Sequence, residues 1–86
     1  MNRWRVVVLD AGGGAKIVIT ERYNGRRVEC GRRVHVDPPG LFMRLCGDSL
    51  ARRVARAADR LQGWCDERNL YLDEADSFER FFAAEG

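Results

Sequence analysis

The chain has 86 residues, 33% of them charged, and a formal net charge of +2. A chain of this length forms one domain, and its thin core leaves little room to enclose a deep active site. The longest apolar run, Val6–Leu9, is far shorter than the ~20 residues of a membrane-spanning helix, and residues 2–5 are not followed by a signal-peptide core. We therefore expect one domain over residues 1–86 that is cytoplasmic and has no membrane partner.

Residues 1–36 contain three runs in which apolar and polar residues alternate, the pattern of half-buried strands. The runs are Trp4–Asp10, Ala15–Tyr23 and Arg26–Val36. Glycines 12–14 separate the first two runs, and Asn24-Gly25, the strongest short-range hairpin signal, separates the second from the third. The sequence therefore predicts a three-stranded antiparallel β-meander.

The loops also predict how the strands pair. A two-residue turn at Asn24-Gly25 pairs Ile19 with Cys30, a four-residue loop at residues 11–14 pairs Val8 with Ile17, and the two loops agree on the side of the sheet that is apolar. In this register one face is apolar and forms the core: Trp4, Val6, Val8, Ile17, Ile19, Val28, Cys30, Val34 and Val36.

The opposite face of the predicted sheet gathers positive charge around an apolar floor of Val7, Leu9 and Val18. Its basic side chains are those of Arg3, Arg5, Lys16, Arg22, Arg27 and Arg33, with His35 beside them. Arg32 falls on the core side, and the neighbouring Gly31 predicts a β-bulge that turns it outward. We therefore expect a basic sheet face that suits an anionic partner.

Two prolines end the third run, and residues 37–47 form a connector. Asp48 or Ser49 can cap a helix over residues 48–69. Apolar residues recur along it at helical spacing and should cover the core face of the sheet: Leu50, Val54, Ala57, Ala58, Leu61 and Cys65.

Asn69 marks the predicted end of that helix, and residues 73–84 predict a second helix with acidic residues in its first turn, as the helix dipole favours. The predicted fold is α+β: a three-stranded antiparallel meander, one long covering helix and a shorter acidic C-terminal helix. Charge is divided along the chain, because residues 1–60 carry thirteen Lys or Arg and six Asp or Glu, whereas residues 61–86 carry two and seven.

The two predicted helices carry opposite charges that bear on the choice of partner. Arg52, Arg56 and Arg60 recur every four residues, a spacing at which like charges repel. The acidic residues that follow are Asp73, Glu74, Asp76 and Glu79. They either offset the arginines within the molecule or form a separate face for a protein partner, and both alternatives stay open.

The sequence holds no familiar catalytic or metal-binding pattern. Gly12–Gly14 leads into a strand, whereas a phosphate loop leads into a helix. The only histidine has no nucleophile motif beside it. Separations of five, eleven and nineteen residues do not suit a zinc site built from Cys30, His35, Cys46 and Cys65. The odd number of cysteines indicates reduced thiols, and we expect no metal, no cofactor and no enzymatic activity.

We interpret the chain as a binding protein whose basic sheet face contacts nucleic acid or a nucleoprotein complex, because a twisted antiparallel sheet can enter a DNA major groove. The β-β-β-α order resembles, in architecture only, that of the three-stranded arm-binding domains of phage-type integrases. An alternative is a phage or mobile-element inhibitor of the anti-CRISPR type, or an adaptor, that binds a protein target through the acidic helix or the arginine face. The apolar floor also offers a surface for homodimerisation.

Overall fold

A computed structural model describes the backbone of residues 3–85 and the side chains of residues 3–72. The strands form one antiparallel sheet in the order β1-β2-β3, which confirms the predicted meander and the α+β class. Two helices follow the sheet. The five elements are β1 (Arg5–Gly12), β2 (Ala15–Asn24), β3 (Arg27–Val36), α1 (Leu41–Leu45) and α2 (Leu50–Glu85).

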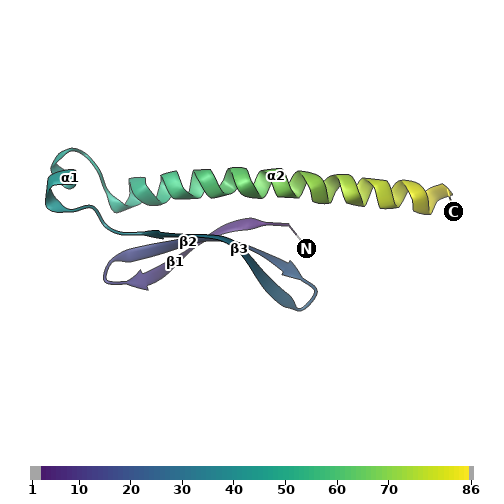
Figure 1. The fold of residues 1–86 in the computed structure, drawn as a ribbon, viewed down its shortest axis with the longest axis horizontal. Helices are drawn as coiled ribbons and strands as arrows, with labels where there is room; N and C mark the ends of the chain where they lie inside the picture. The colour runs from purple at the N-terminus through teal and green to yellow at the C-terminus, as the bar shows by residue number, and fades with distance from the viewer. Residues whose placement is uncertain (1–2, 86) are drawn as a thin grey trace.

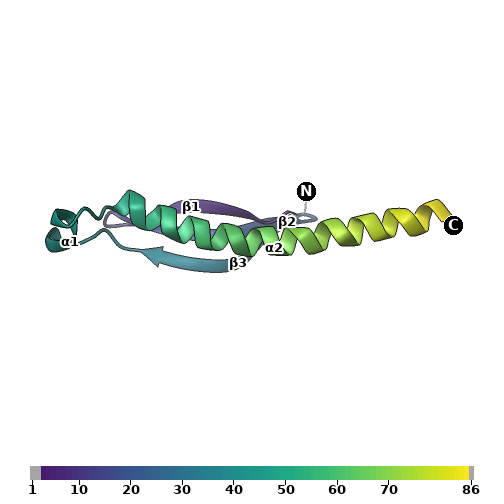
Figure 2. The same ribbon diagram turned by 90° about the horizontal axis from the view of Figure 1, so that it is seen from above.

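The long helix α2 covers one face of the sheet and continues past its end (Figure 1). The molecule is therefore elongated, with extents of 64 × 25 × 12 Å. Seen from above, β1 lies on one side of α2 and β3 on the other (Figure 2). No element of the described residues covers the opposite side of the sheet, which we call the open face.

The observed strand pairing differs from the predicted pairing by one residue. Val8 lies opposite Val18, whereas the sequence predicted Ile17. The second hairpin is displaced because its turn consists of Gly25 and Arg26 and so begins one residue later than expected. Gly25 has a φ of +67° and Arg26 does not have a positive φ, which is the pattern of a type II′ turn with glycine first.

The first hairpin loop is tighter than predicted. Gly12 pairs with Ala15, so the turn consists of Gly13 and Gly14, whose φ values are +61° and +80°. Two positive φ values suit a type I′ turn, which glycine adopts without strain. The pairing is irregular between Asp10 and Gly12, and this bulge takes up the residue that the four-residue loop was expected to hold.

The core follows the observed register. Val18 has no exposed surface, and Val18, Val36 and Leu61 form the centre of the hydrophobic cluster between sheet and helix. The expected core residues Ile17 and Ile19 lie on the other side of β2 from Val18, because side chains alternate along a strand, and of the two Ile19 is still buried, with 9% of its surface exposed. The predicted helix stripe is confirmed, since the residues packed around this cluster or buried beside it include Leu50, Val54, Ala57, Ala58 and Cys65.

The predicted bulge near Gly31 is confirmed. Thr20 faces both Gly31 and Arg32, because the register shifts at this point of β2 and β3. The backbone N–H of Arg32 donates to the buried Thr20 Oγ1 at 2.7 Å, and the Arg32 side chain is exposed. A Cβ atom at Gly31 would lie 2.3 Å from the Trp64 ring, so a residue without a side chain is needed where the helix approaches the sheet.

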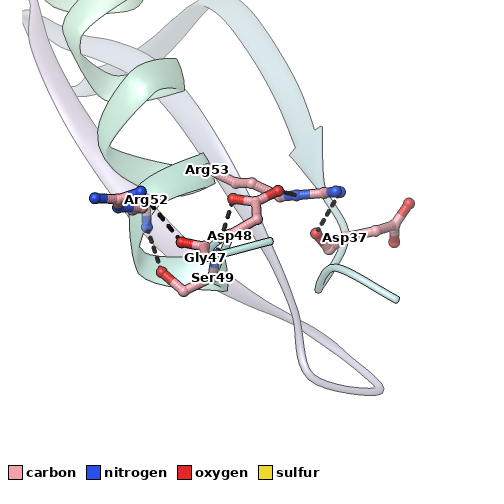
Figure 3. Close-up of polar contacts among 6 residues, drawn as sticks. All are labelled: Asp37, Gly47, Asp48, Ser49, Arg52 and Arg53. Atoms are coloured by element: carbon pink, nitrogen blue, oxygen red, sulfur yellow. Dashed lines mark hydrogen bonds and ion pairs between the residues drawn. The ribbon is translucent and has the colours of Figure 1, made fainter. Parts of the chain in front are cut away.

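Helix α2 begins at Leu50, and its N-cap is Ser49, one of the two residues that the sequence predicted for this role (Figure 3). Ser49 Oγ accepts a hydrogen bond from the backbone N–H of Arg52 at 3.2 Å, the usual N-cap geometry. Asp48 Oδ1 in turn accepts from the backbone N–H of Ser49 at 2.8 Å.

The predicted helix end at Asn69 is wrong, because α2 continues to Glu85 without a break. The side chains of the predicted acidic helix over residues 73–84 lie outside the described residues. The two alternatives for Asp73, Glu74, Asp76 and Glu79 therefore stay predictions. Among the described residues, no helix is both long enough and apolar enough to cross a bilayer.

Candidate nucleic-acid interface

The predicted basic sheet face is not a single surface, because the one-residue difference in register reverses the two sides of β2 relative to β1. Arg5 and Arg33 lie on the open face, since they share it with Ile19 and Glu21. The other predicted contacts within the strands, which lie on the α2 side, are Lys16, Arg22 and Arg27. The expectation of a continuous basic face is therefore wrong.

Several of these predicted contacts are also neutralised by neighbouring carboxylates. Arg5 Nη2 lies 2.7 Å from Glu21 Oε1, on the residue directly opposite it in β2. This interaction raises the pKa of Arg5 further, chiefly through the side-chain hydrogen bond. Lys16 pairs with Asp10 on the adjacent strand.

Arg22 is held in the same way. Its Nε lies 2.9 Å from Glu29 Oε2, directly across the β2–β3 pair. The pKa of Glu29 is lowered because its carboxylate accepts hydrogen bonds from the Asn24 amide and from Arg22. Arg5, Lys16 and Arg22 thus form ion pairs across neighbouring strands, which limits what they offer to an external anion, whereas Arg27 and Arg33 have no carboxylate at ion-pair distance among the described residues.

The open face is apolar at its centre. Val7 lies opposite Ile19, and Leu9 lies opposite Ile17. Farther along the same face, Tyr23 and Val28 are about half exposed, at 46% and 49%. Arg33 and His35 border this patch on the edge strand β3.

Another group of arginines lies between β3 and α2. A pocket of about 380 Å³ is bounded on one side by residues 34–37, at the end of β3, and on the other by α2 side chains: Arg53, Arg56, Ala57 and Arg60. We call it the arginine pocket. Two of the three helix arginines predicted from the sequence, Arg56 and Arg60, line it. Arg52 does not, because its Nη1 donates to the Gly47 carbonyl at 3.1 Å.

Arg53 is the fixed member of this pocket (Figure 3). Its Nε donates to Asp48 Oδ2 at 2.7 Å and its Nη1 to the Asp37 carbonyl oxygen at 3.4 Å, so it ties the end of β3 to the first turn of α2. The hydrogen bond from Arg53 lowers the pKa of Asp48. Within residues 3–72, neither Arg56 nor Arg60 has a carboxylate at ion-pair distance, so both charges are available to a ligand.

A second pocket, also of about 380 Å³, lies farther along α2 where the helix crosses the start of β1. We call it the aromatic pocket, because two tryptophans and a tyrosine form its walls. The Trp4 and Trp64 rings meet edge to face with centroids 4.8 Å apart. The residues that line it are Trp4, Arg22, Gly31, Trp64, Arg68, Tyr71 and Leu72.

An arginine guanidinium group lies over each indole ring of the aromatic pocket. Arg22 lies over Trp4 at 4.9 Å from the ring centroid, and Arg68 lies over Trp64 at 4.3 Å. Cation–π contacts of this kind are worth about 0.5–2 kcal/mol, more where water is excluded. The Trp64 Nε1–H group is buried without a hydrogen-bond acceptor among the described residues, so the cluster is not fully satisfied by the protein itself.

The two pockets lie on one side of α2. Residues three or four positions apart share one side of a helix, and the series that connects the pockets is Arg53, Arg56, Arg60, Trp64, Arg68 and Tyr71. We call this series the α2 track. At 1.5 Å per residue it spans about 27 Å. β3 borders it at both ends, through Gly31 and through residues 34–37.

Sequence reasoning found part of this site. It named Arg56 and Arg60 but missed Arg53, Arg68 and the three aromatic residues. The spacing of Trp64 and Arg68 after Arg60 was a signal that the sequence contained. The approach of Trp4 to Trp64 was not, because it depends on the register of β1 and on the absence of a side chain at Gly31.

The thiols and carboxylates of the described residues do not assemble into a metal centre. In that part of the chain no group of three or more His, Cys, Asp or Glu side chains is close enough to hold a metal ion. Cys65 belongs to α2 and is fully buried, and desolvation raises the pKa of its thiol, so it acts as a packing residue. Cys30 and Cys46 are exposed.

No protein-family model matches this chain, no curated protein matches its sequence, and no solved structure matches its fold. Its function is therefore inferred from the α2 track and the open face.

Proposed function

We propose that this protein is a non-catalytic nucleic-acid-binding protein that contacts the phosphate backbone through the α2 track. The observation that carries the proposal is the arginine pocket, where Arg56 and Arg60 lie side by side without a carboxylate partner among the described residues. Like charges at this helical spacing repel, and a bound phosphate chain offsets that repulsion.

The charge distribution supports this assignment. Residues 3–72 carry fourteen Lys or Arg and eight Asp or Glu, so the described part of the chain has a net charge of +6. Four of these eight carboxylates form ion pairs, with Arg5, Lys16, Arg22 and Arg53, and three others, Asp59, Asp66 and Glu67, lie on α2 together with its arginines, so the described residues keep a net positive charge. A field of one sign attracts a polyanion and speeds its association.

A binding assay over a range of salt concentrations tests the proposal. A fluorescently labelled oligonucleotide is titrated with the protein, and anisotropy gives the affinity. Binding should weaken steeply as salt rises, because phosphate contacts release counterions. The double variant Arg56→Gln/Arg60→Gln should bind more weakly and should reduce the slope of log K against log salt by about 2, one for each lost phosphate contact.

The matched control is Arg5→Gln/Arg33→Gln, which removes the same charge from the open face. It should retain most of the affinity and most of the salt slope. Loss of affinity in the open-face variant but not in the α2 variant would assign the contact to the sheet. Absence of binding by the unmodified protein at low salt would rule out the function.

A second candidate function, binding of a protein partner, is favoured by exposed apolar surface. No element of the described residues covers the open face, where Leu9 is 45% exposed and its neighbours Val7 and Ile17 are partly buried. At the end of the molecule, α1 exposes Leu41, Phe42 and Leu45, which are 76%, 75% and 80% accessible. Exposed apolar side chains that form a patch are typical of protein interaction sites.

An inhibitor or adaptor of mobile elements, or a homodimer, would use such a surface. Light scattering distinguishes the homodimer, and capture from nuclease-treated extract tests for another protein. Substitution Leu9→Lys should abolish either interaction while leaving nucleic-acid affinity at the α2 track unchanged. An interaction that survives both Leu9→Lys and Phe42→Lys would not use these surfaces.

A further inference from the structure

We propose that the aromatic pocket receives an unstacked nucleobase, so that the protein prefers single-stranded nucleic acid to duplex. This inference rests on the proposed function and adds to it the class of nucleic acid that is bound. The arginine pocket accounts for backbone contact alone, which does not distinguish one kind of nucleic acid from another.

The walls of the pocket have the chemistry that recognises a base. Unpaired bases stack on aromatic side chains and on the planes of arginine guanidinium groups. Tyr71 is 66% exposed, and the guanidinium groups of Arg22 and Arg68 lie over the two indole rings. A volume of about 380 Å³ lies within the range of small-molecule sites, so a single base can be accommodated.

The pocket is already formed before a ligand enters. Asn69 binds the backbone of Trp4 at both its N–H and its carbonyl, and the lack of a side chain at Gly31 lets Trp64 pack against the sheet. Glu29 holds Arg22 in its position over Trp4 through an ion pair in which Arg22 Nε lies 2.9 Å from Glu29 Oε2. Binding therefore does not have to order these side chains first, which lowers the entropic cost of recognition.

The position of the pocket explains why a single strand is the fitting ligand. Trp64 lies one helical turn beyond Arg60, so a strand with its phosphates along the arginine pocket brings its next nucleotides to the aromatic pocket. A single strand can present a base there without losing pairing. A duplex must first unpair and unstack that base, which costs several kcal/mol.

The two tryptophans of the chain both line this pocket, so intrinsic tryptophan fluorescence reports its occupancy directly. The experiment titrates the full chain with an unlabelled single-stranded oligonucleotide, with a duplex of the same sequence, and with an abasic strand that keeps the phosphates but lacks the bases. The single strand should change the fluorescence saturably and bind about tenfold more tightly than the other two.

Tyr71→Ala tests the base contact, because the side chain is exposed and its removal should not unfold the protein. It should weaken single-strand binding about tenfold and leave duplex binding unchanged. Leu70→Ala is the matched control, since Leu70 is the neighbouring residue, is 63% exposed and does not line the pocket. It should bind the single strand like the unmodified protein.

The outcomes separate the base pocket from the proposed function. Equal affinity for the single strand, the duplex and the abasic strand, with no fluorescence change, would overturn the base pocket while nucleic-acid binding stands. The same holds if Tyr71→Ala and Leu70→Ala bind alike. Absence of binding to all three probes at low salt would overturn both.

Discussion

Asn69 binds both backbone groups of Trp4: its Oδ1 accepts from the Trp4 N–H at 2.7 Å, and its Nδ2 donates to the Trp4 carbonyl oxygen at 3.0 Å. A side chain in the middle of α2 thus takes the place of a strand partner for the residue that precedes β1. The pair fixes the distance between the sheet and the helix at the end where Trp4 meets Trp64.

Asn69→Ala should destabilise the protein by about 1–3 kcal/mol, because two partly buried backbone groups lose their hydrogen bonds. Urea unfolding followed by circular dichroism measures this change. Gln62→Ala is the control, since Gln62 bonds Asp66 on the exposed surface of the same helix and should cost only about 0.2–0.5 kcal/mol. Equal losses in the two variants would contradict the role assigned to Asn69.

Substitution of alanine for glycine should change the stability of the protein in opposite directions at two positions. At Gly31 a Cβ atom would lie 2.3 Å from the Trp64 ring and 2.8 Å from Thr20 Oγ1, so Gly31→Ala should destabilise by about 1–3 kcal/mol. At Gly63, in α2, a Cβ atom meets nothing within 4 Å, and Gly63→Ala should stabilise by up to about 1 kcal/mol through helix propensity. Melting temperatures of the two variants that shift in the same direction would contradict this assignment.

The elements of the fold could be predicted because each has a local signal. Alternation predicted the strands, the prolines predicted the end of β3, and Ser49 was one of the two predicted caps of α2. The end of α2 could not be predicted from Asn69, because this residue serves a tertiary contact with Trp4 rather than a C-cap.

The pairing register of the strands could not be predicted from the local sequence, because two neighbouring turns are both acceptable. Asn24-Gly25 and Gly25-Arg26 are both acceptable two-residue turns, of type I′ and type II′, and they differ by one position. The choice decides which face carries Val18 and which carries Ile17. It therefore decided the candidate site as well, because the predicted basic face existed only in the register that the chain does not adopt.

Acid should weaken the attachment of α2 to the end of β3. The Arg53 hydrogen bond lowers the pKa of Asp48 in the folded protein relative to the unfolded chain. The ionised carboxylate therefore stabilises the fold above the ordinary Asp pKa of about 4, and this stabilisation is lost as pH falls through the lowered value. Asp48→Asn should lower Tm at pH 7, and its difference from the unmodified protein should shrink in acid.

The partner variant gives the control for this acid effect. Arg53→Gln removes the same interaction from the other side, so the double variant should melt little below the lower of the two single variants, as expected for residues in direct contact. Additive losses at pH 7, or a difference for Asp48→Asn that is constant between pH 7 and pH 2, would show that the ion pair does not stabilise the folded chain.

Adjacent residues of β2 provide a direct test of the register. Val18 is fully buried against α2, whereas Ile17 lies on the open face. Threonine has a high strand propensity at both positions, so the main difference between the variants is the environment of the new hydroxyl group. Val18→Thr should cost about 1–3 kcal/mol because that hydroxyl is buried in an apolar cluster. Ile17→Thr should cost less than about 1 kcal/mol, and chemical denaturation compares the two. The reverse order would restore the pairing in which Ile17 belongs to the core, and with it the single basic face.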